Sequence, residues 1–253
     1  NTLIGIKKEN NLFSSDDIKD LEKQLKKVRS KLFSAKTKET KIKYRDIDKE
    51  LRNQIAEKLK DQGLPVESAE KLAAWDPYDQ NASSAFFDPE WMFDIKDGFD
   101  VVIGNPPYIL VQNIPNLNES IKKKYLEFKS AQYKIDLYHL FIEKGINLLS
   151  ETGIISYITP NTFIKNKHNN LLREVIYKNC HIETVVLFYS QVFESVSVDN
   201  LVFVFTKTRT KSISNIFEIR KSINDISKSK NEFNESGIQP PDYVFNFDIN
   251  DEK

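Results

Sequence analysis

The spacing of apolar residues divides the chain into a helical first part and a second part in which strands and helices alternate. Within residues 14–62, one apolar stripe recurs at alternating intervals of three and four residues, as on one face of a helix. This stripe consists of Ile18, Leu21, Leu25, Val28 and Leu32. A second stripe consists of Ile47, Leu51, Ile55 and Leu59, and it ends before Gly63 and Pro65. The two stripes predict an antiparallel helical hairpin.

Residues 75–93 form an aromatic and acidic connector with little periodicity, and after it the pattern changes. Short apolar runs predict strands at 99–104, 153–159, 181–189 and 201–206, and longer amphipathic runs predict helices at 118–128, 136–149 and 165–178. Because the run at 99–104 is almost wholly apolar and rich in β-branched residues, it is typical of a strand buried on both faces.

Strands that alternate with helices predict an α/β fold with a mostly parallel sheet, to which the last hairpin adds an antiparallel edge strand. We expect four segments. Residues 1–13 are a strand remnant of the core, with the strand itself at 2–6, and residues 14–74 are a helical insertion. Residues 75–206 are the core that carries the chemistry, and the Ser-, Asn- and Lys-rich stretch 207–253 is a linker toward a further domain.

Composition excludes several classes of protein. The 253 residues carry 37 basic and 37 acidic side chains, so net charge provides no argument for nucleic-acid binding. The lone Cys180 excludes a disulfide framework and a zinc site of paired cysteines, and it fits the reducing cytoplasm. No apolar run reaches the roughly 18–20 residues of a membrane span. Because the chain begins at Asn1 without Met, we expect it to be a piece of a longer protein.

The seven glycines are widely spaced, and no two of them form a GxG pattern. The chain therefore lacks a phosphate-binding loop and a dinucleotide fingerprint. Any glycine loop for a nucleotide-like cofactor must lie outside these residues.

The hairpin at 14–62 is slightly basic by local count, and two interpretations stay open. It is either a packing insertion with a solvated lysine face or a dedicated DNA-binding arm. The first is favoured, because runs of charge usually serve solubility.

The most informative segment directly follows the predicted strand 99–104. It reads Asn105, Pro106, Pro107 and Tyr108. Each proline removes a backbone donor, so this turn offers carbonyl acceptors and almost no N–H groups. The Asn105 side chain adds an acceptor and Tyr108 adds a flat ring. The turn lies at the carboxyl edge of the sheet, where α/β folds place their ligands.

Such a cluster of acceptors suits a planar amino group on an electron-poor carbon, such as N6 of adenine. If the Asn105 side-chain oxygen and the Pro106 carbonyl each accept one N–H, the nitrogen is drawn toward tetrahedral geometry. Its lone pair then points at an electrophilic methyl group while Tyr108 stacks on the ring. Most of the rate would come from positioning and electrostatics.

An Asn-Pro-Pro-Tyr sequence after an apolar strand resembles the signature of amino-group methyltransferases that use S-adenosylmethionine. Three downstream segments resemble the motifs that follow in these enzymes: DLY with FIE at 136–143, GIISYITPNTF at 153–163 and SQVF at 190–193. The connector that ends in FFDPEWMF at 86–93 is similar to that of the fused restriction–modification enzymes of the Eco57I-like, type IIG kind.

The resemblance implies a Rossmann-like class I methyltransferase sheet that transfers a methyl group from S-adenosylmethionine to N6 of adenine in DNA. The enzyme would belong to a restriction–modification or phage-defence system. The family includes enzymes fused to a type II endonuclease, so nuclease and target-recognition domains are candidates for the rest of the full-length protein. An adenine inside a duplex is out of reach, so base flipping is implied.

The resemblance also implies residue roles. The catalytic residues are Asn105, Pro106, Pro107 and Tyr108, and the flipped base contacts Tyr108 and Phe193. Asn1, Asn105 and Pro107 contact the cofactor, and no metal is expected because His139, His168 and His181 lack ligand spacing. The glycine-rich cofactor motif is absent, so we expect this piece alone neither to bind S-adenosylmethionine nor to methylate.

Several alternatives remain at this stage. The same turn serves enzymes that methylate a glutamine amide or an RNA adenine, and a non-catalytic interaction module would use the hairpin at 14–62. The sequence from Asn105 to Tyr108 is also compatible with a plain strand-ending turn or a peptide signal, although such signals lie on exposed tails. Phe193 fits a core residue as well as a base contact, and Asp136 and Tyr138 fit capping and packing.

Overall fold

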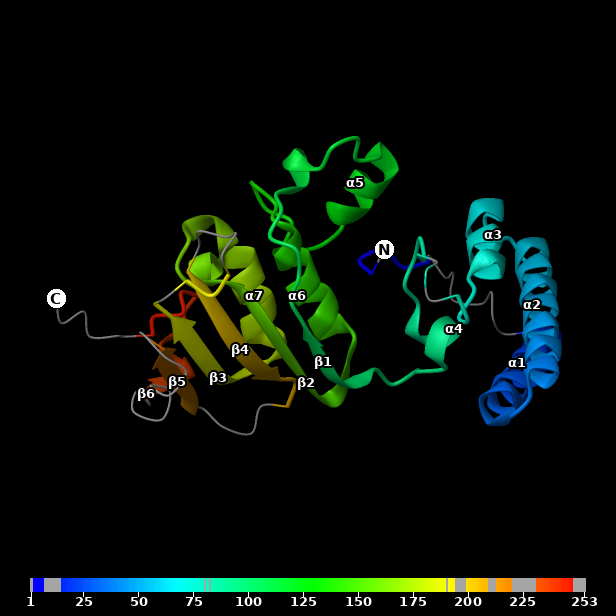
Figure 1. Ribbon diagram of the computed structural model, residues 1–253. Coiled ribbons are helices and arrows are strands. Elements are labelled where there is room, and N and C mark those ends of the chain that lie inside the picture. The colour runs from blue at the N-terminus through cyan, green and yellow to red at the C-terminus, as the bar shows by residue number, and fades with distance from the viewer. Residues whose placement is uncertain are drawn as a thin grey trace. The chain divides into compact units, whose positions relative to one another are not determined.

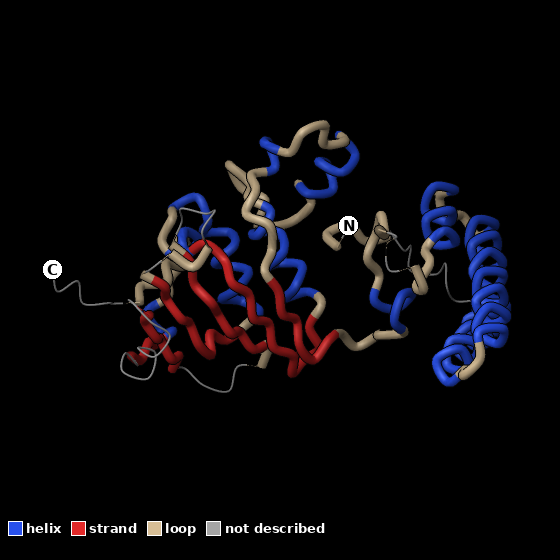
Figure 2. Tube along the Cα trace, in the orientation of Figure 1, coloured by secondary structure: helices blue, strands red, loops and turns tan. Residues whose placement is uncertain are grey.

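A computed structural model of the chain divides into two compact units, Asn1–Phe93 and Asp94–Lys253. The structure describes residues 2–6, 15–79, 81, 83–189, 191–193, 199–208, 213–219 and 231–247. Figure 1 labels the elements, and Figure 2 shows a helical first unit and a second unit built on a sheet. No helix in the described ranges is long and apolar enough to cross a lipid bilayer.

The first unit contains the predicted helical hairpin. Helix α1 spans Asp16–Ser34 and helix α2 spans Lys38–Asp61, where the Thr37 side chain accepts the N–H of Thr40 at the start of α2. The helices are antiparallel, since the start of α1 meets the end of α2 through Lys58 and Asp17, 2.9 Å apart. Two shorter helices follow, α3 at Val66–Ala74 and α4 at Pro89–Phe93.

A buried carboxylate ties this unit together. Asp48, which is fully buried on α2, accepts hydrogen bonds from Arg29 Nε at 2.9 Å and Arg52 Nε at 2.7 Å. The Tyr78 hydroxyl donates to it as well, at 2.8 Å, and burial beside this carboxylate raises the pKa of Tyr78. Arg52 also donates to the carbonyl of Trp75, so the network joins both helices to the connector.

The connector belongs to the helical unit rather than to the unit with the sheet, so the boundary between the units lies at Phe93 and not at the expected residue 75. Phe86, Trp91 and Met92 are buried in the same apolar cluster as α1 and α2. The predicted strand at 2–6 is not formed: this segment has no strand geometry, although the Phe87 N–H donates to the Ile4 carbonyl at 2.8 Å.

The second unit contains a six-stranded mixed sheet in the order β1-β2-β4-β3-β5-β6. Its strands are β1 Phe99–Gly104, β2 Leu149–Pro160, β3 His181–Phe188, β4 Asn200–Thr206, β5 Ile213–Ile219 and β6 Asn231–Asn234. β1 pairs in parallel with β2, and β3 with β5, so β1, β2, β3 and β5 point the same way. The α/β class and the mostly parallel direction of the strands are confirmed.

The antiparallel strand β4 was expected at the edge of the sheet, but it lies between β2 and β3. It pairs antiparallel with both, Ile158 facing Val202 on one side and Val186 facing Val202 on the other. β3 lies two strand positions away from β2 in the sheet. β4 fills the position between them, where both of its edges form hydrogen bonds. A hairpin pattern in the sequence does not reveal this second pairing.

The prediction that β1 is buried on both faces is wrong. Val101 and Ile103 are 61% and 78% exposed, whereas Val102 packs against the main core. Within the described residues β1 pairs only with β2, so it forms one edge of the sheet and one of its faces is uncovered. Apolar character in the sequence does not show whether a second layer covers a strand.

The segment 207–253 was predicted to be a linker, but its described parts are folded onto the sheet. β5 pairs with β3 in parallel, and β6 pairs antiparallel with β5. Phe245 and Phe247 are only 1% and 3% exposed, and the fully buried Arg173 donates to the Asp242 carbonyl at 2.8 Å. Because most residues of this segment are polar, its sequence pattern does not reveal that a few apolar residues, such as Phe245 and Phe247, hold it against the core.

Helices α5 Glu119–Tyr125, α6 Leu137–Asn147 and α7 Asn170–Asn179 lie near the predicted positions. The apolar sides of α6 and α7 join the sheet in one buried cluster that contains Ile142, Ile176 and Phe203. Short 3₁₀ turns lie at Val111–Asn113, Asn161–Ile164, Lys167–Asn169 and Glu235–Gly237. The first three of these turns lie in the segments that connect the strands of the sheet to its helices (Figure 1).

We expect Asp48→Ala to destabilise the first unit by about 3–5 kcal/mol, because it leaves the buried Arg52 guanidinium without its counter-charge. Urea unfolding followed by circular dichroism measures this loss. The matched control is Asp46→Ala, an exposed carboxylate two residues away, which should change stability by less than about 0.5 kcal/mol. Equal effects of the two substitutions would contradict the role of Asp48.

Candidate active site

The Asn-Pro-Pro-Tyr turn lies where the sequence predicts it, at the carboxyl end of β1. Gly104, the last residue of β1, is paired with Tyr157 of β2, so the turn runs beside the carboxyl half of β2. Asn105 is exposed, Pro106 is buried, and Pro107 and Tyr108 are half-buried. The Asn105 side chain is therefore accessible to a ligand while the backbone behind it is packed.

The Tyr108 side chain is fastened to β2. Its hydroxyl donates to the Ile158 carbonyl at 2.9 Å, and burial raises the pKa of Tyr108 to about 12, an effect that the neighbouring Asn200 side chain partly offsets. The phenol thus remains protonated at neutral pH. Its hydroxyl fixes the orientation of the ring.

Tyr108 also brings together two aromatic residues that are far apart in the sequence. The Phe193 ring lies edge-on to it, with centroids 6.4 Å apart, and the Tyr138 ring lies edge-on at 6.2 Å. Edge-to-face pairs at these separations are favourable aromatic contacts. The two predicted base-contacting residues, Tyr108 and Phe193, are therefore neighbours in the structure.

The chain that leaves the turn is held by the segment before α6. Leu110 and Asp136 form an isolated antiparallel bridge, and the Leu137 N–H donates to the Ile109 carbonyl at 3.0 Å. Burial raises the pKa of Asp136, and hydrogen bonds from the N–H groups of Tyr138, Ile109 and Leu137 partly offset this shift. The Asp-Leu-Tyr motif thus contacts the end of the Asn-Pro-Pro-Tyr turn as well as beginning a helix.

Two buried polar residues at this edge escaped the sequence analysis. Asn200, the first residue of β4, is 1% exposed and faces Pro160 of β2. Thr159 is fully buried, and its hydroxyl has no hydrogen-bond partner in the part of the chain that the structure describes. The only sequence signal is that Thr159 lies near the end of one apolar strand and Asn200 at the start of another. Polar residues at strand ends are too common to single these two out.

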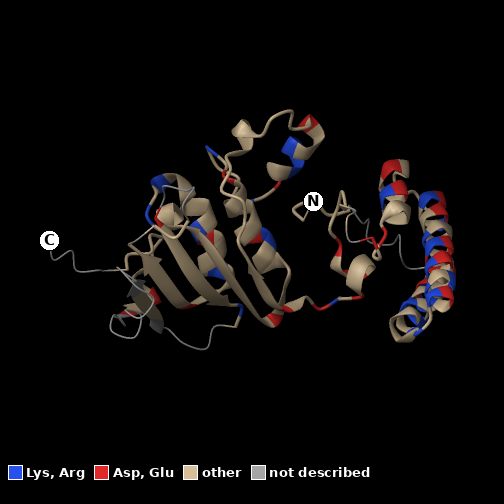
Figure 3. Cartoon of the chain, in the orientation of Figure 1, with Lys and Arg blue, Asp and Glu red and all other residues tan. Residues whose placement is uncertain are grey.

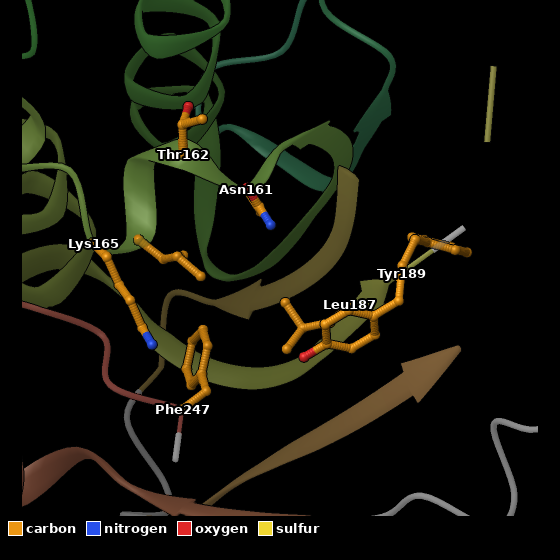
Figure 4. Close-up of a pocket in the computed structure, with 8 residues that line it drawn as sticks. Asn161, Thr162, Lys165, Leu187, Tyr189 and Phe247 are labelled. Atoms are coloured by element: carbon orange, nitrogen blue, oxygen red, sulfur yellow. The ribbon is translucent and has the colours of Figure 1, made fainter. Parts of the chain in front are cut away.

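A pocket of about 220 Å³ lies further along the same edge, at the ends of β2 and β3 (Figure 4). It is lined by Asn161, Thr162, Ile164, Lys165, Leu187, Phe188, Tyr189 and Phe247. Lys165 and Tyr189 stand on opposite sides of it in Figure 4. The lining does not include Asn105 or Tyr108, but Thr162 Oγ1 lies 3.0 Å from the Tyr138 hydroxyl, which connects the pocket to the aromatic group around Tyr108.

Of the predicted site residues one remains, Asn1, and the three histidines, from which no metal site was expected, lie apart from the turn in sequence. Asn1 lies outside the described residues. His181 Nδ1 is 2.8 Å from Glu235 Oε1, His168 stacks on Tyr133 with centroids 4.4 Å apart, and His139 is buried at 4% exposure. In the described ranges no group of three or more His, Cys, Asp and Glu residues is arranged to hold a metal ion.

Comparison with known proteins identifies relatives. The sequence profile of the Eco57I restriction-modification methylase family matches residues 10–193. The type II restriction enzyme and methyltransferase RM.Eco57I of Escherichia coli is 38% identical over 109 residues, which are 41% of this chain and 11% of that protein. The type II methyltransferase M.HincII of Haemophilus influenzae is 33% identical over 126 residues, 49% of this chain and 25% of that protein.

Among solved structures, the type IIG restriction endonuclease BpuSI aligns with a TM-score of 0.39 and 24% identity, over 47% of this chain and 15% of that one. The chain thus spans a quarter or less of the length of these relatives.

The buried His139 predicts sensitivity to acid. Burial lowers the pKa of His139 to about 4, below its ordinary value of 6.5, so the folded state takes up this proton later than the unfolded state. Stability is then fully present above pH 6.5 and falls as the pH drops toward 4, by about 3 kcal/mol in total. Urea unfolding between pH 7 and pH 4.5 measures the decline.

We expect His139→Leu to flatten this dependence. His168→Leu, which changes a partly exposed histidine, is the control and should leave the decline in place. A His139→Leu protein that loses as much stability in acid as the unmodified chain would contradict the assignment.

Proposed function

The chain belongs to the Eco57I restriction-modification methylase family, and on this premise we propose that it supplies the amino-group-binding part of an S-adenosylmethionine-dependent DNA adenine-N6 methyltransferase. The observation that carries the proposal is the Asn105–Tyr108 turn at the carboxyl end of β1, with Asn105 exposed and Tyr108 fastened to β2 and flanked by Phe193. These residues combine two acceptors with an aromatic surface at one edge of the sheet.

The proposed chemistry follows from the groups present. The Asn105 side-chain oxygen and the Pro106 carbonyl accept the two N–H bonds of the adenine amino group, and the prolines remove backbone donors that would compete. The nitrogen is thereby drawn toward tetrahedral geometry, which exposes its lone pair. Because the methylated nitrogen loses its proton readily, the site needs no strong general base. Positioning and electrostatic stabilisation carry the rate.

Tyr108 and Phe193 hold the extruded base in this proposal. The hydrogen bond from Tyr108 to the Ile158 carbonyl occupies its hydroxyl, so the ring acts through its face and not through proton transfer. Extruding a base from a duplex costs a few kcal/mol, and aromatic contacts recover part of this cost. The adenine must be out of the stack before its amino group reaches Asn105.

The residues of this chain fit the cofactor only in part. S-adenosylmethionine, when bound, supplies an electrophilic methyl group, and the exposed Asn105 with the half-buried Pro107 would contact it. The chain has no glycine pair that could form a loop around the methionine or the nucleoside. We place that loop in a further part of the enzyme, packed on the exposed apolar face of β1 at Val101 and Ile103.

Two other acceptors share this chemistry, the amide of a glutamine and an adenine in RNA. The curated relatives bear the names of type II methyltransferases, which favours a restriction–modification enzyme that acts on DNA. Mass spectrometry of DNA, RNA and protein exposed to the full-length enzyme distinguishes the three. N6-methyladenine in DNA supports the proposal, whereas a methyl group in either of the other polymers replaces it.

In the full-length enzyme, we expect Asn105→Ala to lower the rate of methyl transfer by at least 100-fold, because one of the two acceptors of the amino group is lost. Tyr108→Phe keeps the ring and should lose less than about tenfold, whereas Tyr108→Ala should lose far more. N6-methyladenine quantified by mass spectrometry gives the rates. Asp100→Asn, an exposed residue of the same strand, is the control. Normal turnover of Asn105→Ala would refute its role.

The isolated chain of 253 residues should not bind S-adenosylmethionine, since it has no glycine-rich loop. Isothermal titration calorimetry tests this at micromolar to millimolar ligand, with the full-length enzyme as the positive control. Measurable heat with the isolated chain would show that the residues present here suffice for the cofactor, and it would overturn this part of the proposal.

A further inference from the structure

The charges of the helical hairpin are separated along its length. Residues 23–45, the end of the hairpin where α1 turns into α2, contain ten basic residues and one acidic residue, Glu39. The opposite end, residues 15–22 with 46–61, contains nine acidic and five basic residues. We refer to residues 23–45 as the basic tip. The zero net charge of the whole chain conceals it, and Figure 3 shows the distribution of charge along the hairpin.

Half of the ten cations of the basic tip are exposed lysines that have no counter-charge in the described ranges. Five exposed lysines form no ion pair with any residue that the structure describes, and these are Lys31, Lys36, Lys38, Lys41 and Lys43. At the opposite end, Lys58 pairs with Asp17 at 2.9 Å and Lys60 pairs with Glu57 at 2.8 Å. Lys58 and Lys60 are therefore neutralised at one end of the hairpin, whereas these five lysines at the other end have no carboxylate partner among the residues that the structure describes.

Packing does not account for the basic tip. The apolar stripe of the hairpin is already buried, with Ile18, Leu25 and Leu32 at 8% exposure or less. Phe33, beside the buried Leu32, points outward and is 95% exposed. The Phe33 ring is therefore accessible to a partner that meets the surrounding lysines.

The hairpin also holds these groups in place. The buried Asp48 links α1 to α2 through Arg29 and Arg52, and the Thr37 side chain caps the start of α2. From residue 23 to its end, α1 extends for about 18 Å, at about 1.5 Å per residue. Duplex DNA carries one negative charge per about 1.7 Å of its axis, so a duplex of this length carries about ten phosphates on its two strands.

We propose that the basic tip is a second DNA-binding site, which binds the phosphate backbone of duplex DNA through Lys31, Lys36, Lys38, Lys41 and Lys43. Phe33 contacts the sugars or bases beside these phosphates. The identity of the polyanion rests on the proposed function, whereas the separation of charge stands by itself. A membrane surface is disfavoured, because Phe33 and Ile42 are the exposed large apolar residues of the tip and interfacial helices present a continuous apolar face.

This site changes the interpretation of the hairpin. From the sequence, packing and DNA binding were alternatives for one surface, and packing was favoured. In the structure they are separate: the inner stripe packs, and the five exposed lysines of the basic tip carry charge outside the packed stripe. Phosphate contacts add affinity and orient the protein, but they carry no sequence information.

The test compares two variants of equal net charge. The tip variant carries Lys36→Gln, Lys38→Gln, Lys41→Gln and Lys43→Gln. The control variant carries Lys19→Gln, Lys58→Gln, Lys60→Gln and Lys71→Gln, all of which remove ion-paired lysines of the same unit. Fluorescence anisotropy of a labelled 30-base-pair duplex, between 50 and 300 mM salt, measures binding by the full chain.

We expect the tip variant to bind at least tenfold more weakly at 100 mM salt, and its log–log salt slope to fall by about 3.6, at about 0.9 for each of the four lost phosphate contacts. The control variant should stay within twofold of the unmodified chain. A variant with Arg at the same four positions should bind normally, which excludes a folding defect. Phe33→Ala should weaken binding about fivefold or more without changing the salt slope.

If the tip and control variants lose equal affinity for DNA, net charge alone explains the loss, and the proposal is overturned. Stronger binding to duplex RNA or to vesicles of anionic lipid than to DNA would replace the assigned partner. In the full-length enzyme the tip variant should raise KM for DNA and leave kcat near normal, whereas Asn105→Ala lowers kcat. Failure of the tip variant to change KM, with Asn105→Ala inactive, would remove this inference and leave the proposed function in place.

Discussion

The parallel pairing of β1 with β2 is the constraint on which the candidate active site depends. Its register sets Gly104 beside Tyr157, so the turn that follows β1 runs past Ile158, whose carbonyl accepts the Tyr108 hydroxyl. A slip of one residue would turn each side chain of β1 to the other face and remove Val102 from the core. The prolines add stiffness, but the paired strands decide what the turn faces.

The aromatic group around Tyr108 shows how three chain segments combine into one site. Tyr108 follows β1, Tyr138 begins α6, and Phe193 follows β3, and they meet because all three segments reach the same edge of the sheet. The bridge between Leu110 and Asp136 fixes the path of the chain between the first two segments. The acceptors at Asn105 and Pro106 are thus backed by packed residues and not by a free loop.

Charge is used in two opposite ways in the helical unit. Inside, Asp48 is fully buried and accepts hydrogen bonds from two arginines and a tyrosine, a network that is stable only when every partner is present. At the basic tip, five exposed lysines have no counter-charge among the described residues, which suits a partner that brings negative charge of its own. One network holds the hairpin rigid, and the other set of charges is available to a ligand.

The sequence by itself determined the local features: the hairpin from its apolar spacing, the α/β alternation, and the acceptor turn from two prolines that fix their own backbone. Only the tertiary structure decided what depends on distant neighbours. It placed β4 between β2 and β3, exposed Val101 and Ile103, paired β5 of the polar segment with β3, and set Asn200 beside Tyr108. The reason is physical: propensity and periodicity act within a few residues, whereas burial, strand order and side-chain partners depend on residues brought together from afar.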